Sequence, residues 1–266
     1  MDAPFFWGIM TASLVLSSKR GVGRVGRKFG ILSLFSTSRT SLGLSTSSLR
    51  PSVSSLLRDP SLIPDIEDGI SALFDVNDPS NNEIIAQIPV MGQADAEHAI
   101  QVSYDTLPAW RDGTTASCRG NLLQKWSNLM RENANDLAIL MTLESGKPLV
   151  ESHGEVNYAM SFLDYYSAEA VRSSGAGGGV ILPTFASTPS GSPRGQVMAT
   201  QQAVGVAALI TPWNFPSAMI TRKVGPALAA GCTAVVKPSE LTPLSAIALQ
   251  TLAERAGIPP NVFQVV

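Results

Sequence analysis

The sequence is poor in the residues that build disulfide frameworks and metal centres. Only two cysteines and two histidines occur among its 266 residues. Two thiols are too few for a disulfide framework, and such sparing use of cysteine fits a reducing compartment. His98 and His153 lie far apart in the sequence, so no local cluster of Cys and His can bind a metal ion. We therefore expect neither a disulfide-stapled fold nor a metal site.

Acidic residues are almost missing from the first 58 positions. This segment contains eight basic residues and one acid, Asp2, and it is rich in Ser, Arg and Leu. It carries +7, and because the whole chain has a net charge of -2, the remainder carries -9. An acidic body argues against nucleic acid or an anionic membrane as a partner, since both require clustered positive charge.

The composition of residues 1–58 is typical of a mitochondrial transit peptide, and we expect import into the matrix. Import across a membrane that is negative inside favours cations, which gives the pattern a physical cause. Two alternatives remain open, a secretory signal and a disordered tail. No positive charge precedes the apolar run at 5–16, and that run is too short to span a bilayer.

The composition of a packed protein begins near Ile66, and 44% of the whole chain is hydrophobic. Residues 74–77 and 83–88 are predicted to be strands on either side of a turn at 78–82. A helix is expected from Ala94 to Leu107, before Pro108.

Helical periodicity is clear in the following segment, where Gly146 is expected to end one helix and Pro148 to begin the next. Two apolar stripes at helical spacing are interpreted as core. The first stripe consists of Leu122, Trp126, Leu129, Met130, Leu137, Leu140 and Met141, and the second of Tyr158, Phe162, Tyr165 and Tyr166.

Glycine and proline gather in residues 174–195, which are expected to form a loop or hairpin. These glycines neither follow a strand in the G-x-G-x-x-G pattern nor open a helix. A flexible connection is therefore the better interpretation than a phosphate cradle.

Strands and helices alternate after this connection. Strands are predicted at 204–210, 233–237 and 262–266, with helices at 216–230 and 243–256 between them. The first strand is a continuous apolar run, as expected for a strand buried on both faces. This βαβαβ succession predicts an α/β fold with parallel strands, half of a doubly wound sheet.

Two polar clusters follow the first two strands, at 211–216 and 237–240. Ligands of open parallel sheets bind beyond the carboxyl ends of the strands, where these clusters are expected to meet. The first turn has no glycine fingerprint, so a dinucleotide must bind in a different way from the usual one. Lys237 and Glu240 suit an adenosine ribose, because the acid can accept from both hydroxyls and the lysine can reach a hydroxyl or the pyrophosphate.

Several long strings resemble the aldehyde dehydrogenase superfamily. They are Ile210-Thr-Pro-Trp-Asn-Phe-Pro216, Ala218-Met-Ile-Thr-Arg-Lys-Val-Gly225, Ala229-Ala-Gly-Cys-Thr233 and Val236-Lys-Pro-Ser-Glu240. Met219-Ile-Thr-Arg-Lys223 and Leu143-Glu-Ser-Gly-Lys-Pro-Leu149 are similar to succinate-semialdehyde dehydrogenases in particular. The resemblance spans residues 74–266. It implies an incomplete NAD(P)-binding domain over 59–266, an oligomerisation hairpin near 174–203 and the absence of the catalytic domain.

The resemblance also implies roles for individual residues. Asn214 matches a catalytic asparagine whose amide stabilises the oxyanion formed on the aldehyde, a donor worth about 3 kcal/mol in the transition state. Arg222 matches an arginine that binds the distal carboxylate of the substrate, which a guanidinium can grip with two hydrogen bonds. The cofactor-binding positions are Ile210, Thr211, Pro212, Trp213, Asn214, Lys237, Ser239 and Glu240. The alternatives are a turn residue for Asn214, an exposed helix charge for Arg222 and a solvated loop for the Lys–Glu pair.

The implied reaction is NAD(P)-dependent oxidation of succinate semialdehyde to succinate, a step of γ-aminobutyrate degradation, in a homo-oligomer. NAD is the expected cofactor because Glu240 repels a 2′-phosphate, with NADP still possible beside Lys237. The nucleophilic cysteine and the base of the family are not found, and Cys118 and Cys232 are interpreted as ordinary thiols. Two other hypotheses stay open, a short non-catalytic interaction subunit and a dehydrogenase of another aldehyde.

Overall fold

A computed structural model describes residues 48–66, 72–172, 178–184, 189–191 and 195–266. These residues belong to one compact unit, 43–266. Residues 1–47 of the predicted transit peptide, 1–58, lie outside the described residues. Within the described part of the chain, no helix is long and apolar enough to cross a membrane.

Packing begins earlier than the predicted boundary at residue 58. Leu49, Val53 and Leu57 are buried, and α1 (Pro51–Ser54) lies between the first and last of them. The backbone N–H of Gln87 donates to the carbonyl of Ser48 over 2.9 Å. Apolar residues four positions apart bury one side of this segment. The Ser- and Arg-rich composition of the segment does not indicate this pattern. A short 3-10 helix, η1 (Pro60–Leu62), follows.

The two predicted strands are confirmed as β1 (Leu73–Asn77) and β2 (Ile84–Pro89), which pair antiparallel. The predicted end of the next helix is wrong, because α2 (Gln93–Arg111) continues through Pro108 for another turn. Proline removes a helical N–H and disfavours this continuation. Burial of Leu107 and Trp110, at 5% and 2% exposed, offsets that cost.

Three helices form the next layer, α3 (Ala116–Glu132), α4 (Ala134–Ser145) and α5 (Leu149–Glu169). The first apolar stripe is confirmed as core, with Trp126, Met130, Leu137, Leu140 and Met141 all buried. Gly146 ends α4 in the left-handed conformation, as predicted. The second stripe is only partly core. Tyr158 and Tyr165 are 47% and 58% exposed, because α5 packs on α3, α4 and α6 and leaves one side open.

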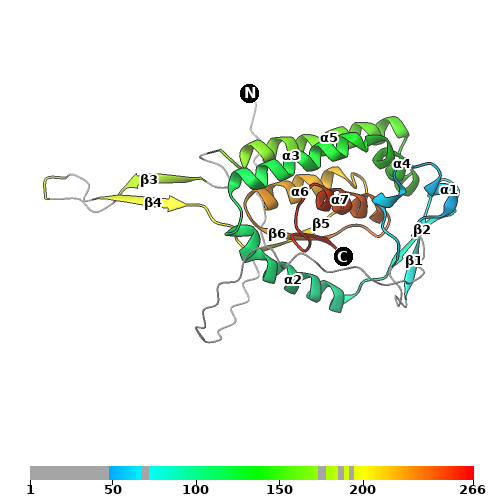
Figure 1. The fold of residues 1–266 in the computed structure, drawn as a ribbon, viewed down its shortest axis with the longest axis horizontal. Coiled ribbons are helices and arrows are strands. Elements are labelled where there is room, and N and C mark those ends of the chain that lie inside the picture. The colour runs from blue at the N-terminus through cyan, green and yellow to red at the C-terminus, as the bar shows by residue number, and fades with distance from the viewer. Residues whose placement is uncertain (1–47, 67–71, 173–177, 185–188, 192–194) are drawn as a thin grey trace, which may run out of the picture. The chain divides into compact units, whose positions relative to one another are not determined.

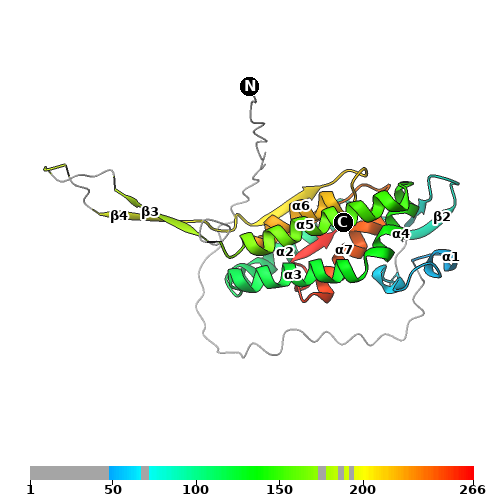
Figure 2. The same ribbon diagram turned by 90° about the horizontal axis from the view of Figure 1, so that it is seen from above.

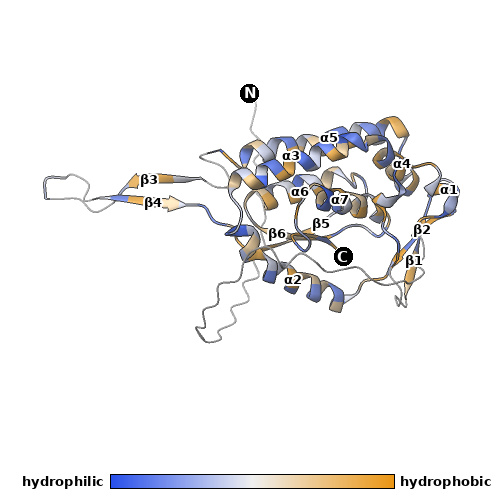
Figure 3. Ribbon diagram, viewed as in Figure 1, coloured by the Kyte–Doolittle hydropathy of each residue, from blue (hydrophilic) through white to orange (hydrophobic). Residues whose placement is uncertain are grey.

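The expected hairpin is present as β3 (Gly179–Pro183) and β4 (Gln196–Thr200), which pair antiparallel. All ten residues of its strands are exposed, and several of them are large and apolar. Figure 1 shows both strands away from the helices, and Figure 3 shows the apolar positions along them.

The predicted parallel sheet is confirmed, with the strand order β5 (Val206–Ile210), β6 (Thr233–Lys237), β7 (Phe263–Val265). The crossover helices α6 (Ala218–Ala229) and α7 (Pro243–Arg255) cover one face, and α2 covers the other (Figures 1 and 2). Helices α3 and α5 pack on the outside of α6. The predicted burial of the first strand on both faces is wrong, since β5 lies at an edge and its Ile210 is 73% exposed.

Candidate functional site

The two polar clusters meet at the carboxyl edge of the sheet. Ile210 and Lys237 are partners in the parallel register of β5 and β6. The N–H of Thr211 donates to the carbonyl of Lys237 over 3.1 Å, and Thr211 is only 4% exposed. The ends of the two strands therefore form one continuous rim, where a parallel sheet offers its ligand site.

Lys237 and Glu240 form an ion pair at this rim. The lysine Nζ lies 2.9 Å from a glutamate Oε, and both side chains are exposed to solvent. A backbone hydrogen bond and then the contact with Lys237 lower the pKa of Glu240, so the carboxylate is ionised at neutral pH. Ser239 uses its hydroxyl to accept from the N–H of Leu241 over 3.3 Å. A cation and an anion held together in this way fit the hydroxyls of a ribose.

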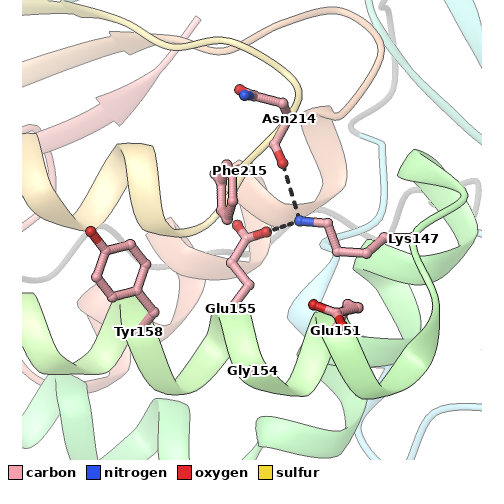
Figure 4. Close-up of a pocket in the computed structure, with 7 residues that line it drawn as sticks. All are labelled: Lys147, Glu151, Gly154, Glu155, Tyr158, Asn214 and Phe215. Atoms are coloured by element: carbon pink, nitrogen blue, oxygen red, sulfur yellow. Dashed lines mark hydrogen bonds and ion pairs between the residues drawn. The ribbon is translucent and has the colours of Figure 1, made fainter.

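A cavity of about 480 Å³ lies between α5 and the loop 211–217 (Figure 4). Its lining residues are Lys147, Glu151, Gly154, Glu155, Tyr158, Asn214 and Phe215. Asn214 turns its carbonyl oxygen toward Lys147, and its side-chain amide points away from that group. The amide has no hydrogen-bond partner among the described residues, which leaves it available to a ligand.

An ion pair between a half-buried lysine and a buried glutamate lies in the wall of the cavity. Lys147 follows Gly146 in the turn between α4 and α5, and Glu155 lies on α5; their side chains are 18% and 1% exposed. The lysine Nζ contacts the Glu155 carboxylate and donates to the Asn214 carbonyl over 3.1 Å. It also lies 4.5 Å from the centre of the Phe215 ring, within the range of a cation–π contact.

Arg222 lies on α6, exposed to solvent and outside the cavity lining. Its guanidinium carbon is 5.7 Å from the centre of the Phe162 ring. Phe162 in turn packs on Tyr158, with 4.7 Å between the ring centres, and Tyr158 lines the cavity. Two aromatic rings thus connect the guanidinium to one end of the cavity.

Both crossover helices have their N-termini occupied by glutamates from outside the sheet. Glu155 accepts from the N–H groups of Ser217 and Ala218 at the start of α6, over 2.9 and 3.2 Å. Glu144 accepts from those of Leu244 and Ser245 at the start of α7, over 2.7 and 3.0 Å. A helix N-terminus is the usual binding site of a pyrophosphate, and the carboxyl groups of Glu155 and Glu144 already occupy these two N-termini.

These residues fit a dinucleotide through its ribose rather than through a phosphate at the N-terminus of α6 or α7. The rim offers Lys237 and Glu240 to a ribose, whereas neither α6 nor α7 offers a free N-terminus to phosphate. This agrees with the sequence, which has no glycine fingerprint at the turn after β5.

Neither cysteine lies at this rim. Cys118 is exposed on α3, and Cys232 is buried just before the start of β6. Strands β5 and β6 are parallel, Asn214 follows the carboxyl end of β5, and Cys232 precedes the amino end of β6. Cys232 therefore lies at the amino ends of the strands, opposite the rim that carries Asn214. Among the described residues, no group of His, Cys, Asp or Glu is arranged to hold a metal ion.

Sequence reasoning missed six lining residues: Lys147, Glu151, Gly154, Glu155, Tyr158 and Phe215. Lys147 stands inside the quoted string 143–149, but nothing in that string reveals its contact with a loop 67 residues later. The available signal was a lysine directly after a helix-ending glycine and close to two glutamates.

Comparison with known proteins agrees with this geometry. Residues 67–266 match the family model described as "Aldehyde dehydrogenase family". The glutarate-semialdehyde dehydrogenase of Pseudomonas aeruginosa is 52% identical over 191 residues, which are 72% of this chain and 37% of that protein. The mitochondrial succinate-semialdehyde dehydrogenase of Homo sapiens is 47% identical over 196 residues, 74% of this chain and 35% of that protein.

A solved structure titled as an E. coli NADP-dependent enzyme superposes with a TM-score of 0.72 at 43% identity, covering 79% of this chain and 43% of that one. The chain thus spans little more than a third of the curated relatives described above. The matched region contains β5, α6, β6, α7 and β7 and every residue of the candidate site. The chain belongs to the aldehyde dehydrogenase family.

Proposed function

We propose that this chain provides the cofactor-binding part of an NAD(P)-dependent dehydrogenase of succinate semialdehyde. The observation that carries the proposal is the rim at which Asn214 and the Lys237–Glu240 pair follow two adjacent parallel strands. Oxidation of an aldehyde through a thiohemiacetal requires a hydride acceptor and a hydrogen-bond donor to the oxyanion, in addition to a cysteine nucleophile and a base.

The cofactor is proposed to lie along this rim. Glu240 accepts from the ribose hydroxyls, Lys237 donates to a hydroxyl or to the pyrophosphate, and residues 210–213 and Ser239 line the cleft. When bound, the nicotinamide supplies the hydride acceptor. Glu240 favours NAD because its negative charge repels a 2′-phosphate, while Lys237 reduces this preference.

Asn214 is proposed to donate its side-chain amide to the oxygen of the aldehyde as negative charge develops there. Neither cysteine can serve as the nucleophile beside it, since one is exposed on α3 and the other lies at the opposite sheet edge. We therefore expect the 266 residues alone to bind the dinucleotide without forming NADH from an aldehyde.

The substrate is proposed to be a short aldehyde that carries a distal carboxylate. Arg222 is exposed on α6 and connected through Phe162 to the Tyr158 end of the cavity. The two curated relatives are named for semialdehydes of dicarboxylic acids that differ by one methylene. Arg222→Ala is expected to abolish binding of succinate semialdehyde to the chain and to leave butanal unaffected. Equal loss of both ligands in NMR titrations would exclude this role.

The test of the proposed function is calorimetric titration of the purified chain with NAD⁺ and NADP⁺. Lys237→Met is expected to weaken NAD⁺ binding by roughly tenfold or more, since it removes a hydrogen bond from a charged donor. Lys125→Met, an exposed lysine on α3, is the matched control. If the wild-type chain does not bind either dinucleotide, the proposal fails.

Self-association is proposed to involve the β3–β4 hairpin. Its exposed apolar side chains include Ile181, 64% exposed, and Met198, 71% exposed, which favour a protein partner over water. Replacing both by serine is expected to lower the molar mass measured by light scattering. An unchanged mass would show that the hairpin is not the interface.

Mitochondrial import is proposed from the basic, acid-poor segment 1–58. A fluorescent protein fused after residue 58 is expected in mitochondria. A version with glutamine at the eight basic positions should stay in the cytosol. Equal distribution of the two fusions would contradict the proposal.

A further inference from the structure

The loop 211–217 carries Asn214 but does little to fix its own course. The Asn214 amide has no partner among the described residues. Ser217, at the N-cap of α6, makes no side-chain cap, and its buried hydroxyl has no partner in the described part of the chain. The first turn of α6 holds the end of the loop, with the Met219 N–H donating to the Phe215 carbonyl over 3.0 Å. The rest of its course is set by groups outside the loop and α6.

Lys147 and Glu155 supply these groups from the other side of the cavity. The lysine holds the carbonyl of Asn214, and the glutamate holds the N–H groups of Ser217 and Ala218. The two anchors lie on either side of Phe215 and Pro216, and the lysine also contacts the Phe215 ring. Backbone held at both ends of so short a segment has little freedom to rotate.

Lys147 and Glu155 each divide their polar contacts between each other and the loop. Glu155 is 1% exposed on its side chain, and one of its oxygens serves the loop while the other contacts Lys147. Removing Lys147 would leave the buried Glu155 carboxylate without its counterion. Because both side chains bond directly to the loop backbone, their positions fix the position of the loop.

We propose that Lys147 and Glu155 are positioning residues for Asn214. They hold the backbone of residues 214–218 so that an amide without a partner of its own is presented to the aldehyde oxygen at the rim. The inference rests on the proposed function of Asn214. Its chemical consequence is large, because a misplacement of about 1 Å in a catalytic group can cost roughly 100-fold in rate.

The experiment uses the whole 266-residue chain and backbone ¹⁵N relaxation at Asn214 and Phe215. Order parameters near 0.85 are typical of rigid backbone and values below about 0.6 of flexible backbone. Lys147→Met, which keeps the apolar stem and removes the charge, is expected to move both residues to the flexible range. Lys147→Arg restores a donor and is expected to restore rigidity. Glu151→Gln, in the same cavity wall, is the control and should change nothing.

A purely stabilising role makes a different prediction. Lys147→Met would then lower the melting temperature while the order parameters at 214 and 215 stayed at their wild-type values, and this result would overturn the proposal. Glu155→Gln keeps the volume and one acceptor oxygen. It serves as the second variant if Lys147→Met does not fold, and the same loss of order is expected.

Cofactor binding separates this inference from the proposed function. Lys147 makes no contact with Lys237 or Glu240, so NAD⁺ affinity in Lys147→Met is expected to stay within about twofold of wild type. The relaxation measurement requires neither cofactor nor turnover. It can therefore refute the positioning role whatever the result of the dinucleotide titration.

Discussion

Glu144 links the stability of the fold to pH. Its side chain is buried at the end of α4, where it accepts two backbone N–H groups and the hydroxyl of Ser245 at the start of α7. Burial raises the pKa of Glu144 to about 8, against the opposing effect of these hydrogen bonds. The folded protein therefore binds a proton here that the unfolded chain releases near pH 4.5.

The sign of the effect follows from linkage. Between pH 4.5 and 8 the folded state holds more protons than the unfolded state, so stability falls as pH rises through this window. A tenfold change in an acid constant corresponds to about 1.4 kcal/mol, so the complete rise corresponds to roughly 5 kcal/mol. For a chain of this size about 1 kcal/mol shifts the melting temperature by roughly 2–4 °C. The expected fall is therefore about 10–20 °C.

The assay is thermal unfolding followed by circular dichroism at pH 5, 6, 7, 8 and 9. Glu144→Gln cannot ionise, so its melting temperature should fall less steeply over this range than that of the wild type. Glu151→Gln, an exposed carboxylate on α5, should follow the wild-type profile. Parallel profiles for wild type and Glu144→Gln would refute the reasoning. A wild-type stability that rises with pH relative to Glu144→Gln would show that the three hydrogen bonds outweigh burial.

Three further substitutions test the packing around the site. Gly146→Ala is expected to lower the free energy of unfolding by about 1–2 kcal/mol, because φ is 71° and alanine is strained there; urea unfolding measures it. Asp136→Asn leaves one of the two N–H groups of residues 58–59 without an acceptor, at a cost of about 1–3 kcal/mol, and hydrogen exchange at 58–59 should accelerate. Gly120→Ala places a Cβ 2.5 Å from the Ser167 carbonyl and should cost about 1–3 kcal/mol by separating α3 from α5; an unchanged urea midpoint would contradict this close packing.

The repeating elements of this fold are visible in the sequence because each has a periodicity of its own. The sequence predicts the strand at 233–237 with the bounds it has in the structure, because Ala234, Val235 and Val236 form a short buried apolar run that ends at Lys237. The failures have tertiary causes. The edge position of β5 exposes Ile210, and the packing of Trp110 carries α2 past a proline that local rules treat as an end.

The same distinction holds at the candidate site. The sequence predicts that residues at the ends of the strands lie close together, because the carboxyl ends of adjacent parallel strands meet at one rim. The sequence does not predict the places of Lys147 and Glu155 at the site, because their contacts with the loop join residues 67 and 62 positions apart. Neither spacing nor composition reports a contact between a helix and a loop at such a separation.

The buried Glu155 also offers a reason why the turn after β5 lacks a glycine fingerprint. A glycine fingerprint allows a pyrophosphate to approach a helix N-terminus closely. Here the Glu155 carboxylate already holds the first N–H groups of α6, and a phosphate brought to the same place would meet a second negative charge. Glycine would gain nothing at this turn, so its positions are free to carry Trp213, Asn214 and Phe215. The Glu155 carboxylate that occupies the N-terminus of α6 thus belongs to the same ion pair that holds the loop backbone beside Asn214.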